Sequence, residues 1–274
     1  MIRKVIIPAA GLGTRLYPAT KVQPKEMLPI FSKTTNNETL VKPVVQVVFE
    51  ELYKANLREF CYIVGKEKRN IEDHFTPDAN CIKNLTQGGK NELANQLEDF
   101  YEKLENSTLM WVNQPEPKGF GNAVMLAQPF VQNENCLVHA GDSAIISKDM
   151  DYLKKLIQAQ EKTQADAIFL ALEIENPKHY GIVEGKEIEP GLIKVSAVVE
   201  KPKKPKTNIA IMAMYIFKPI IFEALAAIKP GTAGEIQLTD GIQKLIEWNR
   251  KVFAVKLDSS YSHLDIGSPE RYWE

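Results

Sequence analysis

Apolar and polar residues follow two alternating patterns along this chain of 274 residues. Short apolar runs predict buried strands, and longer segments with apolar residues on one helical face predict helices. Their alternation is typical of a mostly parallel sheet with helices on both faces. The predicted strands span residues 4–9, 60–64, 109–112, 136–140, 167–172 and 209–217. The predicted helices span residues 43–55, 68–75, 92–104, 122–127, 150–163, 219–227 and 238–248.

Three segments depart from this pattern. Residues 180–200 contain short apolar runs separated by turns, which predicts antiparallel strands in the second half of the chain. Residues 32–41 are polar and predict a surface loop, and residues 76–106 form a longer insertion that we expect at the periphery. The chain shows neither an internal repeat nor a low-complexity linker. We therefore expect a single α/β domain over residues 1–274.

The composition excludes several classes of protein. With 34 Lys and Arg against 35 Asp and Glu, the chain lacks the basic excess of a nucleic-acid-binding protein. No apolar run approaches the length of a membrane span, and we expect no signal peptide before the first strand. Cys61, Cys81 and Cys136 have neither a zinc-ligand spacing nor a disulfide pattern. We therefore expect a cytoplasmic protein without nucleic-acid or membrane partners.

The segment after the first predicted strand carries the strongest functional signal. It is a loop of small residues, whose uncovered backbone N–H groups form a concavity that can bind anionic oxygens. Arg15 and Lys25 then add two cations, so the segment suits a nucleoside triphosphate. We predict Arg15 and Lys25 as the catalytic cations. The predicted nucleotide-binding residues of the loop are Ala10, Gly11, Gly13 and Thr14.

Other interpretations of this loop fit the sequence less well. A G-x-G turn can be purely structural. The dinucleotide-binding pattern G-x-G-x-x-G needs a third glycine where this chain has Leu16, and Pro18 would interrupt the helix that follows. The phosphate-loop pattern G-x-x-x-x-G-K-[ST] is absent as well. The loop is therefore predicted to bind phosphates in a manner different from either pattern.

Polar residues that follow later strands offer the remaining chemistry. Gln114 carries an amide that can pair with the edge of uracil or thymine, and Gly119 lets a base approach the backbone closely. Asp142 follows a buried strand, where a carboxylate that faces a triphosphate can bind Mg²⁺. Glu200 can accept hydrogen bonds from sugar hydroxyls and Lys201 can hold a phosphate, provided that the strand ends there and lets both reach one ligand.

Several of these motifs resemble the signature of sugar-1-phosphate nucleotidylyltransferases. Residues 11–16 (GLGTRL), 18–21 (PATK) and 24–29 (PKEMLP) are most similar to bacterial and archaeal UTP–glucose-1-phosphate uridylyltransferases, and the similarity covers nearly the whole chain. The resemblance implies the nucleotide-diphospho-sugar transferase fold, which is Rossmann-like with a small antiparallel elaboration in its second half. The implied reaction joins UTP and glucose 1-phosphate into UDP-glucose and pyrophosphate with Mg²⁺.

The resemblance also implies a mechanism, an assembly and a set of residue roles. The sugar phosphate attacks the α-phosphorus directly, so no Ser, Cys or His nucleophile is required. In similar enzymes the region of residues 76–106 contributes to subunit contacts, and we expect a homodimer or homotetramer. The implied roles are base recognition by Gln114 and Gly119, metal binding by Asp142 and Asp265, and sugar-phosphate binding by Gly181, Glu200 and Lys201.

Alternatives stay open on the sequence alone. Residues 265–270 (DIGSPE) resemble thymidylyltransferases more closely, so use of dTTP, alone or beside UTP, is one alternative. Ala213 stands where related enzymes have glycine, which leaves the choice of sugar open. A regulatory subunit without activity would have lost phosphate or metal ligands that this chain keeps, and a dehydrogenase is disfavoured by the missing third glycine. Thr239 and Asp240 are expected to cap the last long helix.

Overall fold

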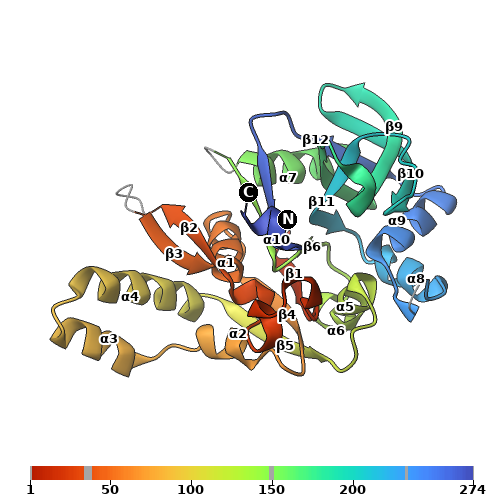
Figure 1. The fold of residues 1–274 in the computed structure, drawn as a ribbon. Coiled ribbons are helices and arrows are strands. Elements are labelled where there is room, and N and C mark those ends of the chain that lie inside the picture. The colour runs from red at the N-terminus through yellow and green to blue at the C-terminus, as the bar shows by residue number, and fades with distance from the viewer. Residues whose placement is uncertain (1, 34–38, 148–150, 232–233, 274) are drawn as a thin grey trace.

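The computed structural model describes residues 2–33, 39–147, 151–231 and 234–273 of the chain. Its centre is one sheet of nine strands in the order β5-β4-β1-β6-β11-β8-β12-β10-β9 (Figure 1). Two further strand pairs form separate small sheets. The strands of the central sheet are β1 (Lys4–Ala9), β4 (Glu59–Gly65), β5 (Thr108–Gln114), β6 (Cys136–His139), β8 (Ala167–Glu173), β9 (Gly181–Glu189), β10 (Leu192–Glu200), β11 (Ile209–Phe217) and β12 (Val252–Lys256).

The predicted α/β fold class is confirmed, with a central sheet that is mixed. β5, β4, β1 and β6 are parallel to one another, and β8 is parallel to β12. β11 runs antiparallel to both β6 and β8 and so separates the two parallel parts. The expected antiparallel elaboration includes the β9–β10 hairpin, because only Pro190 and Gly191 connect its two strands. Gly191 takes a φ of +75° in that turn, which glycine adopts without strain.

Each predicted helix is present, with ends that differ by a few residues. Residue 150, where one helix was predicted to begin, lies outside the described residues. The helices are α1 (Val44–Lys54), α2 (Arg69–His74), α3 (Ala79–Gln87), α4 (Asn91–Glu105), α5 (Phe120–Leu126), α6 (Gln128–Val131), α7 (Asp151–Thr163), α8 (Ile220–Ala227), α9 (Leu238–Glu247) and α10 (Pro269–Trp273). Within the described part of the chain, no helix combines the length and the apolar character that crossing a membrane requires.

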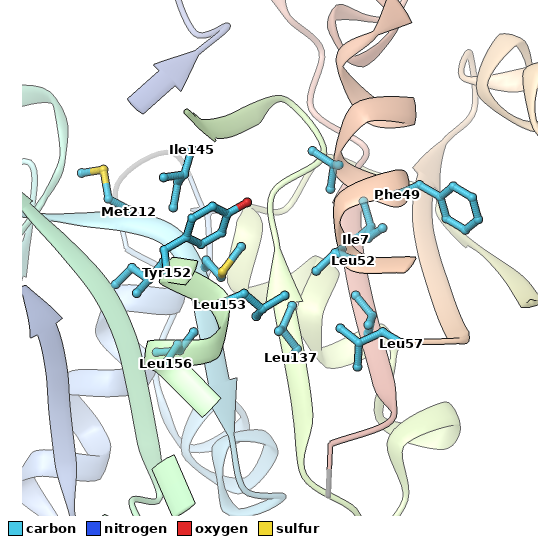
Figure 2. Close-up of a cluster of buried hydrophobic side chains, with 14 of the residues drawn as sticks. Ile7, Phe49, Leu52, Leu57, Leu137, Ile145, Tyr152, Leu153, Leu156 and Met212 are labelled. Carbon is cyan, nitrogen blue, oxygen red and sulfur yellow. The ribbon is translucent and has the colours of Figure 1, made fainter. Parts of the chain in front are cut away.

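Helices cover both faces of the sheet because its strands bury side chains on both sides. In β1, Ile7 joins a cluster that contains Leu52 of α1 and Leu156 of α7 (Figure 2). Its neighbour Ile6 points the other way, into a second cluster that contains Leu225 of α8. The continuous apolar run that predicted β1 is therefore explained by burial on two faces, as in parallel sheets generally.

The surface loop predicted over residues 32–41 is wrong for its two ends. β2 (Pro29–Lys33) and β3 (Thr39–Pro43) pair as antiparallel strands, with Phe31 opposite Val41. Residues 34–38 between them lie outside the described residues. Phe31 and Val41 are 81% and 61% exposed, so this strand pair lacks the buried alternating positions by which a strand is normally predicted.

The predicted insertion over residues 76–106 contains the two helices α3 and α4. α3 buries no residue of its own and packs against α4, and Figure 1 shows the two helices extending away from the central sheet. Asp78 caps α3, because its carboxylate accepts hydrogen bonds from the N–H groups of Asn80 and Cys81. A contact of this helix pair with another subunit stays a prediction.

A carboxyl group between α1 and α7 makes the stability depend on pH. The Tyr152 hydroxyl donates a hydrogen bond to Glu51 Oε2 at 2.7 Å. Burial raises the pKa of Glu51 from 4.5 to about 7, although Tyr152 and Lys54 oppose the shift. The folded protein therefore holds this proton more tightly than the unfolded chain does. Its stabilising contribution is complete below pH 4.5 and is lost as the pH rises through about 7.

Glu51→Gln is expected to remove this pH dependence, because the amide stays neutral. The parent chain should lose this stabilisation as the pH rises from 5 to 8, whereas the variant should not. The stability of the variant relative to the parent chain should therefore increase over this range by at most about 3 kcal/mol, because one unit of pKa corresponds to about 1.4 kcal/mol. Urea unfolding at the two pH values measures the gain. A stability difference that is the same at both pH values would contradict this account of Glu51.

Candidate active site

The predicted phosphate loop lies where the parallel strands β1, β4, β5 and β6 have their carboxyl ends. Gly13 takes a φ of +65° there, a conformation that glycine adopts readily. The Leu16 N–H and the Thr20 hydroxyl both donate to the Gly13 carbonyl oxygen, at 2.9 Å and 2.7 Å, and so close the loop on itself. Three short 3₁₀ turns follow β1: η1 (Thr14–Leu16), η2 (Ala19–Lys21) and η3 (Lys25–Met27).

Lys25 and Asp142 meet beside this loop. Asp142 follows β6, and its Oδ2 forms a hydrogen-bonded ion pair with the Lys25 ammonium. Lys25 Nζ also lies 3.6 Å from the position that a Cβ on Gly11 would take, so the ammonium borders the glycine loop. Each of the two side chains is only 17% exposed. The structure thus brings a cation, a carboxylate and bare backbone N–H groups together.

Lys25 and Asp142 are both charged at neutral pH. Burial alone lowers the pKa of Lys25, but the carboxylates of Asp142, Glu26 and Asp265 outweigh burial and raise this pKa above its ordinary value. Burial alone raises the pKa of Asp142, but the Lys25 ammonium outweighs it and lowers this pKa below its ordinary value. The pair therefore offers fixed charges, and neither group exchanges protons readily near pH 7.

Asp265 lies next to Asp142 because of a small two-stranded sheet. β7 (Ser143–Ile146) begins directly after Asp142, and β13 (Ser262–Asp265) runs antiparallel to it. The Ile266 N–H donates to the Asp142 carbonyl oxygen at 3.0 Å, which holds the two strand ends together. Two carboxylates that are far apart in the sequence are thereby placed at one corner of the site.

These two carboxylates fit a magnesium site. Each has a basic partner in the structure, Lys25 on Asp142 and Arg271 on Asp265, so this corner calls for positive charge. Gly267 leaves room for the second carboxylate, since a Cβ on it would lie 2.8 Å from Asp265 Oδ1. Mg²⁺ commonly takes one or two protein carboxylates together with phosphate oxygens and water. The donor set on Asp142 and Asp265 matches that preference.

Gln114 ends β5 with its side chain already held. Its amide nitrogen donates to Asn122 Oδ1 at 2.8 Å and to the Gly119 carbonyl oxygen at 3.3 Å. The amide carbonyl Oε1 is therefore the group that can accept the N3–H of a uracil or thymine ring. Gly119 has a φ of +97°, and a Cβ on it would lie 2.6 Å from the Ile236 carbonyl oxygen. A side chain at position 119 would displace the segment around Ile236.

Glu200, Lys201 and Gly181 lie together at the open end of the β9–β10 hairpin. Gly181 is the cross-strand partner of Glu200, and Lys201 Nζ lies 3.0 Å from Glu200 Oε1. Lys201 has a φ of +42°, so the backbone turns there and strand alternation stops. The two side chains consequently reach each other, as the position of the strand end predicted.

The capping role predicted for Thr239 and Asp240 is wrong. The residue that precedes α9 is Gln237, and its side chain makes no capping hydrogen bond. Thr239 lies inside the first turn, where its hydroxyl donates to Glu200 Oε2 at 2.7 Å. The Thr239 hydroxyl therefore orients Glu200, which has Lys201 on its other oxygen.

Most of the predicted site residues line one cavity of about 410 Å³. The exceptions are three residues that adjoin its lining: Asp265 lies beside Asp142, and Gly181 and Glu200 lie beside Lys201. The predicted residues that line the cavity are Ala10, Gly11, Gly13, Thr14, Arg15, Lys25, Gln114, Gly119, Asp142 and Lys201.

Burial makes the histidines and thiols near the sheet weakly reactive. It lowers the pKa of His139 to about 4 and lowers the pKa of His263 as well, so both rings are neutral at pH 7. It raises the pKa of the Cys61 and Cys136 thiols to about 12. A buried thiol with a raised pKa is a poor nucleophile.

Two supporting interactions of the site were not predicted from the sequence. Asn122 holds the Gln114 amide, and it follows Gln114 by eight positions in a helix that begins at the same loop. This spacing could have predicted that Asn122 contacts Gln114. Lys68 forms a buried ion pair with Glu26 at 2.7 Å, across 42 positions of sequence. No local sequence pattern connects those two residues. Glu26 lies in a turn after β1 and Lys68 follows β4, and these two strands are neighbours in the sheet.

Comparisons with known proteins identify the family of this chain. Residues 4–274 match the family model described as Nucleotidyl transferase. A UTP–glucose-1-phosphate uridylyltransferase of Bacillus subtilis is 40% identical over 269 residues, which cover 97% of this chain and 87% of that protein. A putative UTP–glucose-1-phosphate uridylyltransferase of Methanocaldococcus jannaschii is 39% identical over 250 residues, which cover 90% of this chain and 83% of that protein.

A solved structure is similar over the same extent. A UDP-glucose pyrophosphorylase complexed with UDP-glucose has a TM-score of 0.85 and 32% identity, and the match covers 99% of this chain and 96% of that one. The chain therefore belongs to the Nucleotidyl transferase family. Within it, the predicted similarity to UTP–glucose-1-phosphate uridylyltransferases is confirmed by these relatives.

Proposed function

We propose that this protein transfers a uridylyl group from UTP to glucose 1-phosphate and releases UDP-glucose and pyrophosphate. The observation that carries the proposal is the cavity that Arg15, Lys25 and Lys201 line together with Asp142 and the base-directed Gln114. Such a cavity offers cations to two phosphate-bearing reactants and an amide to a pyrimidine. The names of similar proteins and the UDP-glucose in a similar structure support the same reaction.

The site suits direct transfer between two anions. An oxygen of the sugar phosphate attacks the α-phosphorus of UTP in line, a new P–O bond forms, and the bond to pyrophosphate breaks. Two unit charges about 4 Å apart repel by roughly 4 kcal/mol at an effective dielectric of about 20. Arg15 and Lys25 offset this repulsion at the nucleotide, and Lys201 offsets it at the sugar phosphate.

Asp142 and Asp265 are the residues that would hold Mg²⁺. When bound, Mg²⁺ neutralises phosphate charge and polarises a phosphoryl oxygen. Lys25 lies between Asp142 and Gly11, so its ammonium can reach oxygens that the glycine loop binds. Thr239 keeps one Glu200 oxygen in place. In this proposal, Glu200 and the neighbouring Gly181 bind the hydroxyls of the sugar.

The proposal is tested by an assay of pyrophosphate release. Four nucleoside triphosphates are combined with several sugar 1-phosphates, with and without Mg²⁺. We expect the highest kcat/KM for UTP with glucose 1-phosphate, and a requirement for Mg²⁺. A preference for dTTP would instead favour a thymidylyltransferase, which Gln114 would serve equally well. Binding of sugar nucleotides without turnover in any combination would contradict the proposal and favour a regulatory subunit.

Gln114→Leu is expected to weaken the binding of UTP. The variant loses the acceptor for N3–H and leaves that donor unpaired in the complex, so the KM for UTP should rise by about tenfold or more, with a smaller change in kcat. Asn113→Ala is the matched control, because this exposed neighbour on β5 points to the other side of the strand. Equal KM values for Gln114→Leu and the parent chain would contradict base recognition by Gln114.

A further inference from the structure

Glu26 is the residue after the proposed catalytic Lys25, and it forms a buried ion pair with Lys68. The two side chains are 1% and 8% exposed, less than in the other ion pairs of the described residues. Glu26 follows Lys25 in η3, whereas Lys68 follows β4. The pair therefore ties the turn that carries Lys25 to the central sheet.

Lys68 is a fixed partner for a short turn. The Lys68 N–H donates to the Gly65 carbonyl oxygen at 3.1 Å, and the Ile71 N–H donates to the Lys68 carbonyl oxygen at 3.0 Å. These bonds join Lys68 to the end of β4 and to the first turn of α2. By contrast, η3 is a single 3₁₀ turn that follows two other short turns. Side chains of a reactive site are held best when rigid elements support them.

Two ion pairs lie close together at this side of the cavity. Lys68 pairs with Glu26, and Lys25 pairs with Asp142. Glu26 also lines the cavity that Arg15 lines. Burial raises the pKa of the Glu26 carboxyl, and Lys68 and then Lys25 are the cations that oppose this rise. Without Lys68, the charged form of Glu26 would have Lys25 as its remaining cation and would compete with Asp142 for the Lys25 ammonium. Removing one partner of a buried ion pair leaves such a charge uncompensated.

We propose that Lys68 is a positioning residue for the transfer reaction. It neutralises Glu26, and the Lys25 ammonium thereby stays directed at Asp142 and the glycine loop. Lys68 acts through Glu26 and not through contact with a substrate. The inference rests on the proposed function, because it assumes that Lys25 serves the phosphates of UTP. It follows that removing both charges of the pair is less harmful than removing the Lys68 charge alone.

Three variants test this order of effects: Lys68→Met, the double variant Glu26→Gln with Lys68→Met, and Lys68→Arg. The readouts are kcat, the KM values for both substrates, and calorimetric binding of UTP without added metal. Lys68→Met should lower kcat and UTP affinity by about 10- to 100-fold. The double variant should recover to within about threefold of the parent chain, and Lys68→Arg should recover part of the loss.

Lys66→Met is the matched control, because it removes an exposed cation from the same segment and leaves Glu26 paired. It should keep the parent values, and thermal unfolding should show that every variant folds. If the parent chain is active and Lys68→Met keeps its kcat and UTP affinity, the role of Lys68 is overturned while the proposed function stands. A folded double variant no better than Lys68→Met would also overturn it, since Lys68 would then act without Glu26. An inactive parent chain would instead count against the proposed function.

Discussion

Arg15→Ala is expected to lower kcat by on the order of 10³-fold, with a much smaller change in the KM for UTP. Arg15 lines the cavity from the turn that follows the glycine loop. A guanidinium can hold two phosphate oxygens at once in a fixed geometry. We expect Arg15 to stabilise the charge that grows on the departing pyrophosphate, because this charge is larger in the transition state than in the bound substrate. Steady-state kinetics at saturating UTP and glucose 1-phosphate measure the loss.

Arg15→Lys separates charge from geometry at this position. Lysine keeps the positive charge but loses the planar pair of donors, so it should recover only part of the lost turnover. The oligomeric state and unfolding temperature of both variants should match those of the parent chain, because Arg15 is exposed. An unchanged kcat for Arg15→Ala at saturating substrates would contradict the assigned role.

Asp142→Asn is expected to lower kcat by about 10²- to 10³-fold and to weaken the dependence of the rate on Mg²⁺. The amide is nearly the same size, so the change removes a charge and not the packing after β6. It leaves the Lys25 ammonium without its closest carboxylate and takes one proposed ligand from the magnesium site. Rates measured across a titration of Mg²⁺ separate a weaker metal site from a slower chemical step.

Asp99→Asn is the control for this variant. Asp99 carries an exposed carboxylate on α4 and forms an ion pair with Lys103 of the same helix, so this variant should keep the parent rate and the parent Mg²⁺ dependence. If Asp142→Asn kept the parent kcat and the parent Mg²⁺ titration, the role assigned to Asp142 would be contradicted.

The parts of the fold with a strong buried pattern were predictable from sequence. β1 and β11 have the predicted ends, because each is a continuous apolar run. The pairing partners of the strands were not predictable in the same way. β7 and β13 were missed because they pair with each other outside the central sheet, and β13 keeps none of its residues fully buried. Phe31 of β2 and Val41 of β3 are exposed, so the alternation of apolar and polar residues gave no signal for these strands.

The site could be predicted for residues that follow a strand and belong to a recognisable motif. Gln114, Asp142 and Lys201 all lie at strand ends, and the cavity brings them together. The residues that hold them in place were not predictable, because their partners come from distant segments. Lys68 reaches Glu26 from the segment that follows β4, the strand beside β1. A sequence motif thus identifies groups that meet a ligand more readily than groups that orient them.

A crystal structure with UDP-glucose and Mg²⁺ would show directly where the product and the ion bind. We expect the diphosphate against residues 11–25, the uracil ring at Gln114, the glucose at Glu200 and Gly181, and the ion on Asp142 and Asp265. A product bound away from residues 11–25, or an ion that contacts neither aspartate, would contradict this expectation.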